Sequence, residues 1–215
     1  MMKTRVNTEK VAWSGRIVSI QPRIRLIRSF DERSHICLGY VLRVEGKIAD
    51  EPGEFIIAIG KTAQAKHHFQ AGMEVSGQAV PVSDQRLETA GFYKAGGLKI
   101  VKDAEGDFPD GPPFHGMPPD LETYRARGHR RLDARTYDVQ CATCTWGCRM
   151  PVEMIIDHWN PSRKRCRFET FCYGPKSCAL YRAVSTRKVL GRKGMSYTED
   201  DWVDEDATSH RGLDD

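Results

Sequence analysis

Apolar and polar residues alternate along much of the first hundred residues, with the period of two that is typical of β-strands. In the segment 11–28, Ile24 and Leu26 alternate with Arg23 and Arg25. Successive side chains of a strand point to opposite faces, so this pattern predicts aliphatic groups on one face and arginines on the other.

Pro22 interrupts the same segment and has no amide hydrogen to give to a neighbouring strand. We therefore expect a bend or an edge position at this point. Further elements follow before residue 103. Strands are predicted over 35–45, 53–60, 73–82 and 97–101, and a helix over 61–70 that ends at the glycine at 72.

The predicted order is strand, strand, strand, helix, strand, strand, and it resembles that of the OB-fold, a five-stranded Greek-key barrel. The resemblance covers residues 10–103 and includes the stretch GKTAQAKHHFQAGMEVSGQAV, where a helix is followed by glycine and a strand. It implies a β-rich (α+β) chain with an OB-like barrel followed by a small metal-stabilised module. Many unrelated functions share this fold, so the resemblance implies architecture first.

Proline and glycine crowd residues 104–124, and residues 105–124 contain no lysine or arginine. Such a composition fits no regular element and indicates a linker. The sequence therefore predicts four parts. These are the OB-like barrel (1–103), the Pro/Gly-rich acidic linker (104–124), a basic cysteine-rich metal-binding module (125–193) and an acidic tail (194–215).

Composition sets the expected compartment. Of the 215 residues 40% are hydrophobic, enough for a packed core, but the longest apolar runs are too short to span a bilayer. No apolar stretch follows the N-terminal residues, so we expect no secretory signal. A cytoplasmic protein without a membrane partner is the expectation.

Six of the seven cysteines lie between residues 141 and 178. Cytosolic thiols stay reduced, so a cluster of this kind indicates metal binding rather than disulfides. Two pairs, each next to a glycine that permits a tight turn, form the simplest tetrahedral set for a structural zinc ion. The predicted ligands are Cys141, Cys144, Cys172 and Cys178.

An iron–sulfur cluster is the alternative cofactor. Three closely spaced cysteines and a distant one are common around a [4Fe–4S] centre. Here Cys148 would join Cys141 and Cys144. Cys166, among arginines and lysines, and the isolated Cys37 are expected to be incidental surface or core residues.

Charge is strongly segregated along the chain. Residues 125–193 carry 16 Lys and Arg against 5 Asp and Glu, whereas residues 194–215 carry 1 against 8. A basic segment of this kind attracts polyanions, nucleic acid first among them. The other interpretation is that the acidic tail folds back and neutralises the basic segment within the molecule.

Single strands are bound by basic side chains along the backbone and by aromatic faces that stack on bases. On an OB barrel the second and third strands usually face the ligand. The candidates for such contacts are Arg23, Arg25, Arg43, Tyr40, Arg130, Arg131, Arg165 and Arg167.

Catalytic motifs give no competing prediction. The triplet Gly60-Lys61-Thr62 resembles the end of a phosphate-binding loop, but Phe55 stands where that loop requires glycine. We therefore predict a non-catalytic protein that binds single-stranded DNA or RNA and carries a structural four-cysteine zinc site. The alternatives are an accessory redox protein with an iron–sulfur cluster, and a scaffold that binds a protein partner through its acidic tail.

Overall fold

The chain was analysed as a computed structural model. The parts of it that the structure describes are residues 9–28, 33–155, 157, 159–160, 162–184, 187–190, 196–199 and 206–215.

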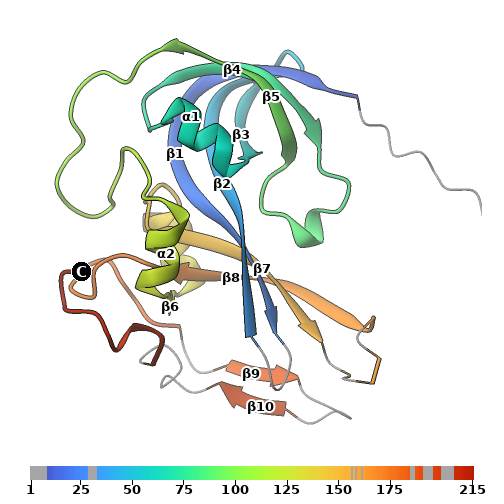
Figure 1. The fold of residues 1–215 in the computed structure, drawn as a ribbon, viewed down its shortest axis with the longest axis vertical. Coiled ribbons are helices and arrows are strands. Elements are labelled where there is room, and N and C mark those ends of the chain that lie inside the picture. The colour runs from blue at the N-terminus through green and yellow to red at the C-terminus, as the bar shows by residue number, and fades with distance from the viewer. Residues whose placement is uncertain are drawn as a thin grey trace, which may run out of the picture.

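The described chain is β-rich, and its helices are short (Figure 1). No helix among the described residues is long and apolar enough to cross a membrane. In chain order the elements are β1 (Val11–Arg28), β2 (Arg33–Ile48), β3 (Glu51–Ile59), α1 (Lys61–His67), β4 (Glu74–Pro81), η1 (Gln85–Leu87), β5 (Phe92–Lys102), α2 (Leu121–Arg127), β6 (Arg130–Arg131), α3 (Ala134–Thr136), η2 (Tyr137–Cys141), β7 (Gly147–Ile155), β8 (Lys164–Cys172), β9 (Arg187–Leu190) and β10 (Ser196–Glu199).

Five strands form a closed ring in the order β1–β2–β3–β5–β4, because β1 pairs with both β2 and β4. All neighbours are antiparallel except β3 and β5, which meet in parallel at Ile57 and Phe92. The helix α1 lies between β3 and β4 in the chain. The predicted order of strands and helix up to residue 102 is confirmed, and we call this part the strand ring.

Alternation along the strands fills the ring with aliphatic side chains. Ile17, Leu42, Val44 and Ile57 are fully buried. Two register shifts between β1 and β2 bend this pair of strands, as β-bulges do. At Gly39, close to one shift, φ is +130° and a Cβ would lie 2.2 Å from a carbonyl oxygen, so only glycine fits.

The strand β1 continues beyond the ring and joins the second half of the molecule. Its last residues, Leu26 to Arg28, pair in parallel with β7, and the sheet continues through β8 to β6 (Figure 1). Pro22 lies between these two sets of contacts, where β1 pairs only with β2, which agrees with the edge position expected for proline. We call residues 121–184 the cysteine module.

One hydrophobic core extends across both halves. Leu26 of β1 belongs to the same buried cluster as Met150, Val152 and Phe171 of the cysteine module. The predicted linker also packs against both halves, since Gly116 accepts a hydrogen bond from the amide of Ala71 and Phe114 packs beside the cysteines. Residues 104–120 therefore lie against the molecule instead of separating two independent units.

The acidic tail is described in two short parts. Residues 196–199 form β10, which pairs with β9. Residues 206–215 pack against the cysteine module through hydrogen bonds to the loop that joins Cys172 and Cys178. This second part lies against the basic segment, as the fold-back alternative expects, but neutralisation of that segment by the tail stays a prediction. Trp202 and the acidic residues around it lie outside the described residues.

Candidate functional site

Four cysteines from distant parts of the chain line one small cavity. Its volume is about 10 Å³, and Phe114, Trp146 and Tyr181 are among the other lining residues. The four are the cysteines predicted as zinc ligands. We call this space the cysteine cavity, and its thiols come from Cys141, Cys144, Cys172 and Cys178.

The first pair lies on a tight turn that follows the π-helical turn η2. The amide of Cys144 donates to the carbonyl oxygen of Cys141 at 3.1 Å, and the amide of Gly147 donates to that of Cys144 at 3.0 Å. A Cβ at position 147 would lie 2.5 Å from the carbonyl oxygen of Cys141. Glycine is required here because the turn folds directly over the start of β7.

The second pair is held by the end of β8 and the loop after it. The amide of Gly174 donates to the sulfur of Cys172 at 3.4 Å, and the amide of Cys178 donates to the carbonyl oxygen of Pro175 at 3.2 Å. The amide of Tyr173 donates to the carbonyl oxygen of Trp146 at 2.9 Å. This last bond ties the two cysteine turns together.

A buried glutamine of β1 connects the strand ring to the first cysteine turn by hydrogen bonds, and we call this contact the clamp. Gln21 Nε2 donates to the carbonyl oxygens of Cys141 and Cys144 at 2.9 and 2.8 Å, and its Oε1 accepts from the hydroxyl of Tyr137 at 2.6 Å. The buried hydroxyl of Tyr124 donates to the next carbonyl, that of Thr145, at 2.7 Å. Sequence patterns gave no signal for Gln21, because its partners lie 116 to 123 residues along the chain.

Burial and mutual repulsion act on the thiols. Burial, together with the other three cysteines, raises the pKa of Cys141 to about 12. Burial raises the pKa of Cys144 to about 11, although the backbone amides of Trp146, Phe114 and Gly147 act in the opposite direction. Amides directed at a sulfur favour its thiolate form, whereas burial disfavours that form.

Three arginines gather around the second cysteine turn, and sequence analysis singled out only one of them. Arg127 lies over the ring of Trp146 at 4.5 Å, and Arg130 lies over the ring of Tyr181 at 3.8 Å. Arg211 is 7% exposed and donates to the carbonyl oxygen of Gly174 at 2.7 Å. Burial, with repulsion from Arg127 and Arg130, lowers the pKa of Arg211 to about 10.

The other three cysteines lie elsewhere. Cys148 is fully buried in the main core, and its sulfur donates to the carbonyl oxygen of Pro22 at 3.2 Å. The trio expected for an iron–sulfur cluster is therefore not assembled at one cavity. Cys166 is exposed and Cys37 partly buried, and all seven thiols are free.

The four cysteines line one cavity, but their sulfurs are not arranged around a common centre. Within the described residues, no three His, Cys, Asp or Glu side chains are arranged closely enough to count as a finished coordination group. Metal binding at the cysteine cavity would thus require these four side chains to turn toward one another within the space that they line.

A second cavity lies where the strand ring meets the cysteine module. It measures about 350 Å³, and we call it the junction pocket. Gln21 and Tyr137 belong to its wall, so it shares two residues with the clamp on the first cysteine turn. The complete lining is Ser19, Gln21, Pro22, Val41, Arg43, Ile56, Gln85, Glu88, Thr89, Ala90, Gly91, Tyr137, Asp138, Arg149 and Phe168.

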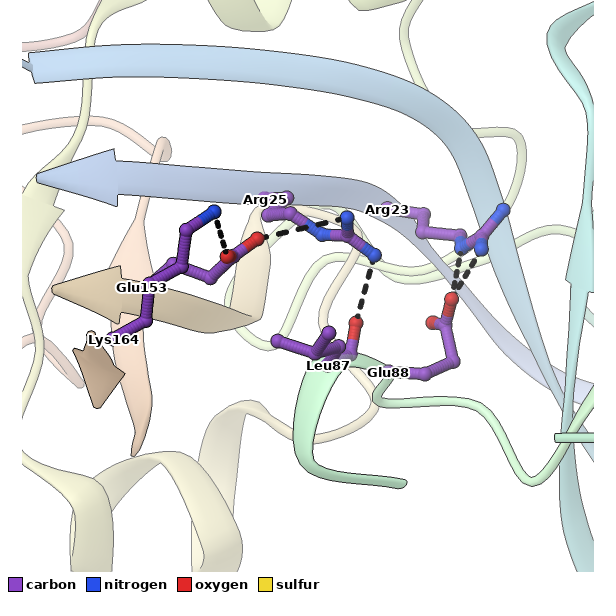
Figure 2. Close-up of polar contacts among 6 residues, drawn as sticks. All are labelled: Arg23, Arg25, Leu87, Glu88, Glu153 and Lys164. Carbon is purple, nitrogen blue, oxygen red and sulfur yellow. Dashed lines mark hydrogen bonds and ion pairs between the residues drawn. The ribbon is translucent and has the colours of Figure 1, made fainter. Parts of the chain in front are cut away.

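Arginines of β1 fix the loop that borders this pocket. Figure 2 shows Arg23 directed at Glu88, and Arg25 directed at the carbonyl oxygen of Leu87 and at Glu153, to which Lys164 also binds. Arg23 Nε donates to Glu88 at 2.9 Å, and Lys164 Nζ lies 2.9 Å from Glu153. These arginines were predicted to contact nucleic acid, but their guanidinium groups hold the β4–β5 loop and β7 against β1.

Tyr40 and Arg131 were also predicted as contacts and are buried instead. Tyr40 is 4% exposed, and its hydroxyl donates to the carbonyl oxygen of Pro119 at 2.9 Å, so its face is not open to a base. Burial raises its pKa to about 12. Arg131 is 2% exposed and lies in the core of the cysteine module.

The remaining predicted arginines differ in their surroundings. Arg43 binds Glu54, and Arg167 binds Glu169 on the same strand. Arg130 is buried against Tyr181 and donates to the carbonyl oxygen of Pro175 at 2.9 Å. Only Arg165 among the predicted set is exposed. The predicted residues thus do not form one open basic surface.

A basic and aromatic pair that the sequence analysis missed lies at the junction pocket. The guanidinium of the exposed Arg149 lies 5.1 Å from the ring centre of Phe168. The two come from neighbouring strands, since Arg149 pairs with Thr170 and Phe168 with Pro151 in the β7–β8 ladder. Both residues line the pocket.

A larger pocket of about 760 Å³ lies beside α1 and α2. Its charged residues are of both signs, with Lys61 and Arg125 facing the same space as Asp120 and Glu122. Tyr40 is its aromatic residue, and the hydroxyl of Tyr40 is already bonded to Pro119. This lining does not favour a polyanion.

No protein-family model, no curated protein and no solved structure matches this chain.

Proposed function

We propose that this protein is a non-catalytic binder of single-stranded nucleic acid, with an OB-like strand ring that presents the ligand site. The ring order β1–β2–β3–β5–β4 and the helix between β3 and β4 agree with that architecture. OB-folds bind oligonucleotides on the face of strands two and three, between the loops that join strands one to two and four to five.

The observation that carries the proposal is the position of the junction pocket. Val41 and Arg43 of β2, Ile56 of β3 and residues 85–91 of the β4–β5 loop line it. These are the elements that an OB-fold uses for its ligand. The cysteine module closes the opposite wall and contributes Arg149 and Phe168.

The chemistry of that wall suits one nucleotide. A guanidinium attracts a phosphate, and a phenyl ring provides a face on which any base can stack, worth about 1–3 kcal/mol per base. A volume of about 350 Å³ is at the lower end of small-molecule sites, which agrees with one base and its sugar. Glu88 in the wall is neutralised by Arg23.

Fluorescence anisotropy with labelled single-stranded DNA and RNA tests the proposal. We expect binding that weakens as salt rises, because displaced counterions accompany each phosphate contact. Arg149→Ala should weaken binding and lower the salt slope by about one contact. Phe168→Leu, which keeps an apolar side chain, should weaken binding roughly tenfold through lost stacking.

Arg165→Ala is the matched control. It removes the same charge from the same strand as Phe168, but residues three apart on a strand point to opposite faces. We expect its effect on affinity to be small. Equal losses of affinity for Arg149→Ala and Arg165→Ala would indicate diffuse attraction to a basic surface and not binding in the pocket. Absence of binding at low salt would contradict the proposal.

A further inference from the structure

We propose that Cys141, Cys144, Cys172 and Cys178 bind one zinc ion through four thiolates, and that Arg127, Arg130 and Arg211 balance the charge of this centre. The inference does not depend on nucleic-acid binding. It rests on the cysteine cavity, on the backbone around the thiols and on the three arginines.

The donor set and the cavity favour a single ion. Four thiols from two tight turns surround one space of about 10 Å³. A closed tetrahedral set of four cysteines is a common structural zinc site. Cys148, the third thiol expected for an iron–sulfur cluster, is directed into the core and not toward this cavity.

Backbone amides partly offset the burial that disfavours thiolates at these sulfurs. The amide of Gly174 donates to the sulfur of Cys172, and backbone amides also act on Cys144. Amide hydrogen bonds stabilise a negatively charged sulfur. Neighbouring hydrogen bonds of this kind orient ligands and tune a metal site.

The arginines supply the second, independent observation. Arg127, Arg130 and Arg211 each have a buried guanidinium nitrogen that no described group hydrogen-bonds. Arg211 donates to the carbonyl oxygen of Gly174 and Arg130 to that of Pro175, both in the loop between Cys172 and Cys178. Buried cations without full hydrogen bonding are unfavourable unless opposite charge lies nearby.

Zinc binding would provide that opposite charge. Four thiols would lose four protons to solvent and bind Zn²⁺ as thiolates, which leaves a net charge of minus two at the centre. Arg127 and Arg130 lie on aromatic rings that line the cavity, and Arg211 binds the backbone of the second turn. Their positive charge would stabilise the tetrathiolate and hold the C-terminal residues against it.

Metal analysis of the purified full chain tests the metal. We expect one zinc per chain, no iron or sulfide, and, after exchange with Co²⁺, the intense visible absorption of a tetrahedral cobalt thiolate. Cys144→Ser should lose the metal. Cys166→Ser, at an exposed thiol, should retain it, and Cys148→Ala should retain it although a core residue is changed.

Stoichiometric iron with sulfide, disulfides among the four cysteines, or a folded protein that takes up no zinc would each overturn the proposal. A Cys148→Ala variant that loses zinc while it stays folded would overturn the assignment of the four ligands.

A chelator competition tests the arginines. Arg130→Gln should weaken zinc binding roughly tenfold, as loss of a supporting group around a metal commonly does. Arg130→Lys keeps the charge and should recover most of the affinity. Arg182→Gln, an exposed arginine of the same module, is the control. Equal affinity for Arg130→Gln and the wild type would overturn the charge-balancing role.

Discussion

In the strand ring, buried aliphatic side chains of β1, β2, β3 and β4 form the centre. Around the four cysteines, by contrast, the centre consists of thiols, aromatic rings and buried arginines. The ring is stabilised mainly by removal of apolar surface from water. The cysteine module depends on directed hydrogen bonds, such as those of Gln21 and Arg211, and, in our proposal, on zinc. The two halves should therefore respond differently to the same perturbation.

Metal removal should give the largest difference between them. Zinc contributes several kcal/mol or more to small metal-stabilised units, because the bound state exists only when the site is folded. With a chelator, we expect amides of the cysteine module such as Gly147 and Tyr173 to exchange hydrogen much faster. Ring amides such as Ile17, bonded to Met73, should change little. Hydrogen exchange by mass spectrometry measures these rates, with zinc-saturated chelator as the control. An equal increase of the exchange rate in both halves would show that zinc does not stabilise the cysteine module selectively.

Leu42→Ala should destabilise the strand ring and leave the zinc site unchanged. Leu42 is fully buried in the ring, and removal of such a side chain destabilises proteins by about 2–5 kcal/mol. We expect that loss in urea unfolding, with zinc content unchanged. Ile36→Ala on the same strand is the control, since Ile36 is 38% exposed and should matter little. Loss of zinc from folded Leu42→Ala would show that the ring controls the metal site.

Gln21→Ala tests the contact between the two halves. The variant would leave the Tyr137 hydroxyl without its acceptor, and the carbonyl oxygens of Cys141 and Cys144 would each keep only a backbone amide donor. An unsatisfied buried group costs about 1–3 kcal/mol, and water from the junction pocket can replace part of the lost bonds, so we expect about 2 kcal/mol. Urea unfolding measures it, and Gln140→Ala at an exposed glutamine is the control. An unchanged free energy of unfolding for Gln21→Ala would show that its hydrogen bonds do not stabilise the contact between the two halves.

Arg211→Ala should have the smallest effect, about 1 kcal/mol. The variant loses the hydrogen bond to Gly174, but it also relieves repulsion from Arg127 and Arg130. Thermal unfolding of the zinc-loaded protein measures the balance, with Arg182→Ala as the control. A stabilised Arg211→Ala would mean that repulsion among the arginines exceeds their attraction to the cysteine centre.

Much of the strand ring was predictable because its information is local. Alternation of aliphatic and polar residues identified β1 with its observed bounds, and the prediction of a helix between the third and fourth strands was correct. Sequence analysis also grouped the four cysteines that line one cavity, because paired cysteines beside glycines are typical of metal sites.

The roles of the arginines and of Gln21 were not predictable from local patterns. Whether an arginine faces solvent depends on a carboxylate or carbonyl far along the chain, as for Arg23 with Glu88, 65 residues away. Arg43 and Glu54 are only 11 residues apart, but they meet only because β2 pairs with β3. An arginine count therefore overestimated the surface available to nucleic acid.

The long strand β1 has a consequence for how the protein can be divided. A fragment that stops after β5 would keep the whole of β1 but lose β7, which covers Leu26 to Arg28. That fragment would expose an aliphatic edge to water and invite association with other copies. The two halves are thus inseparable by simple truncation, and each is best studied within the intact molecule.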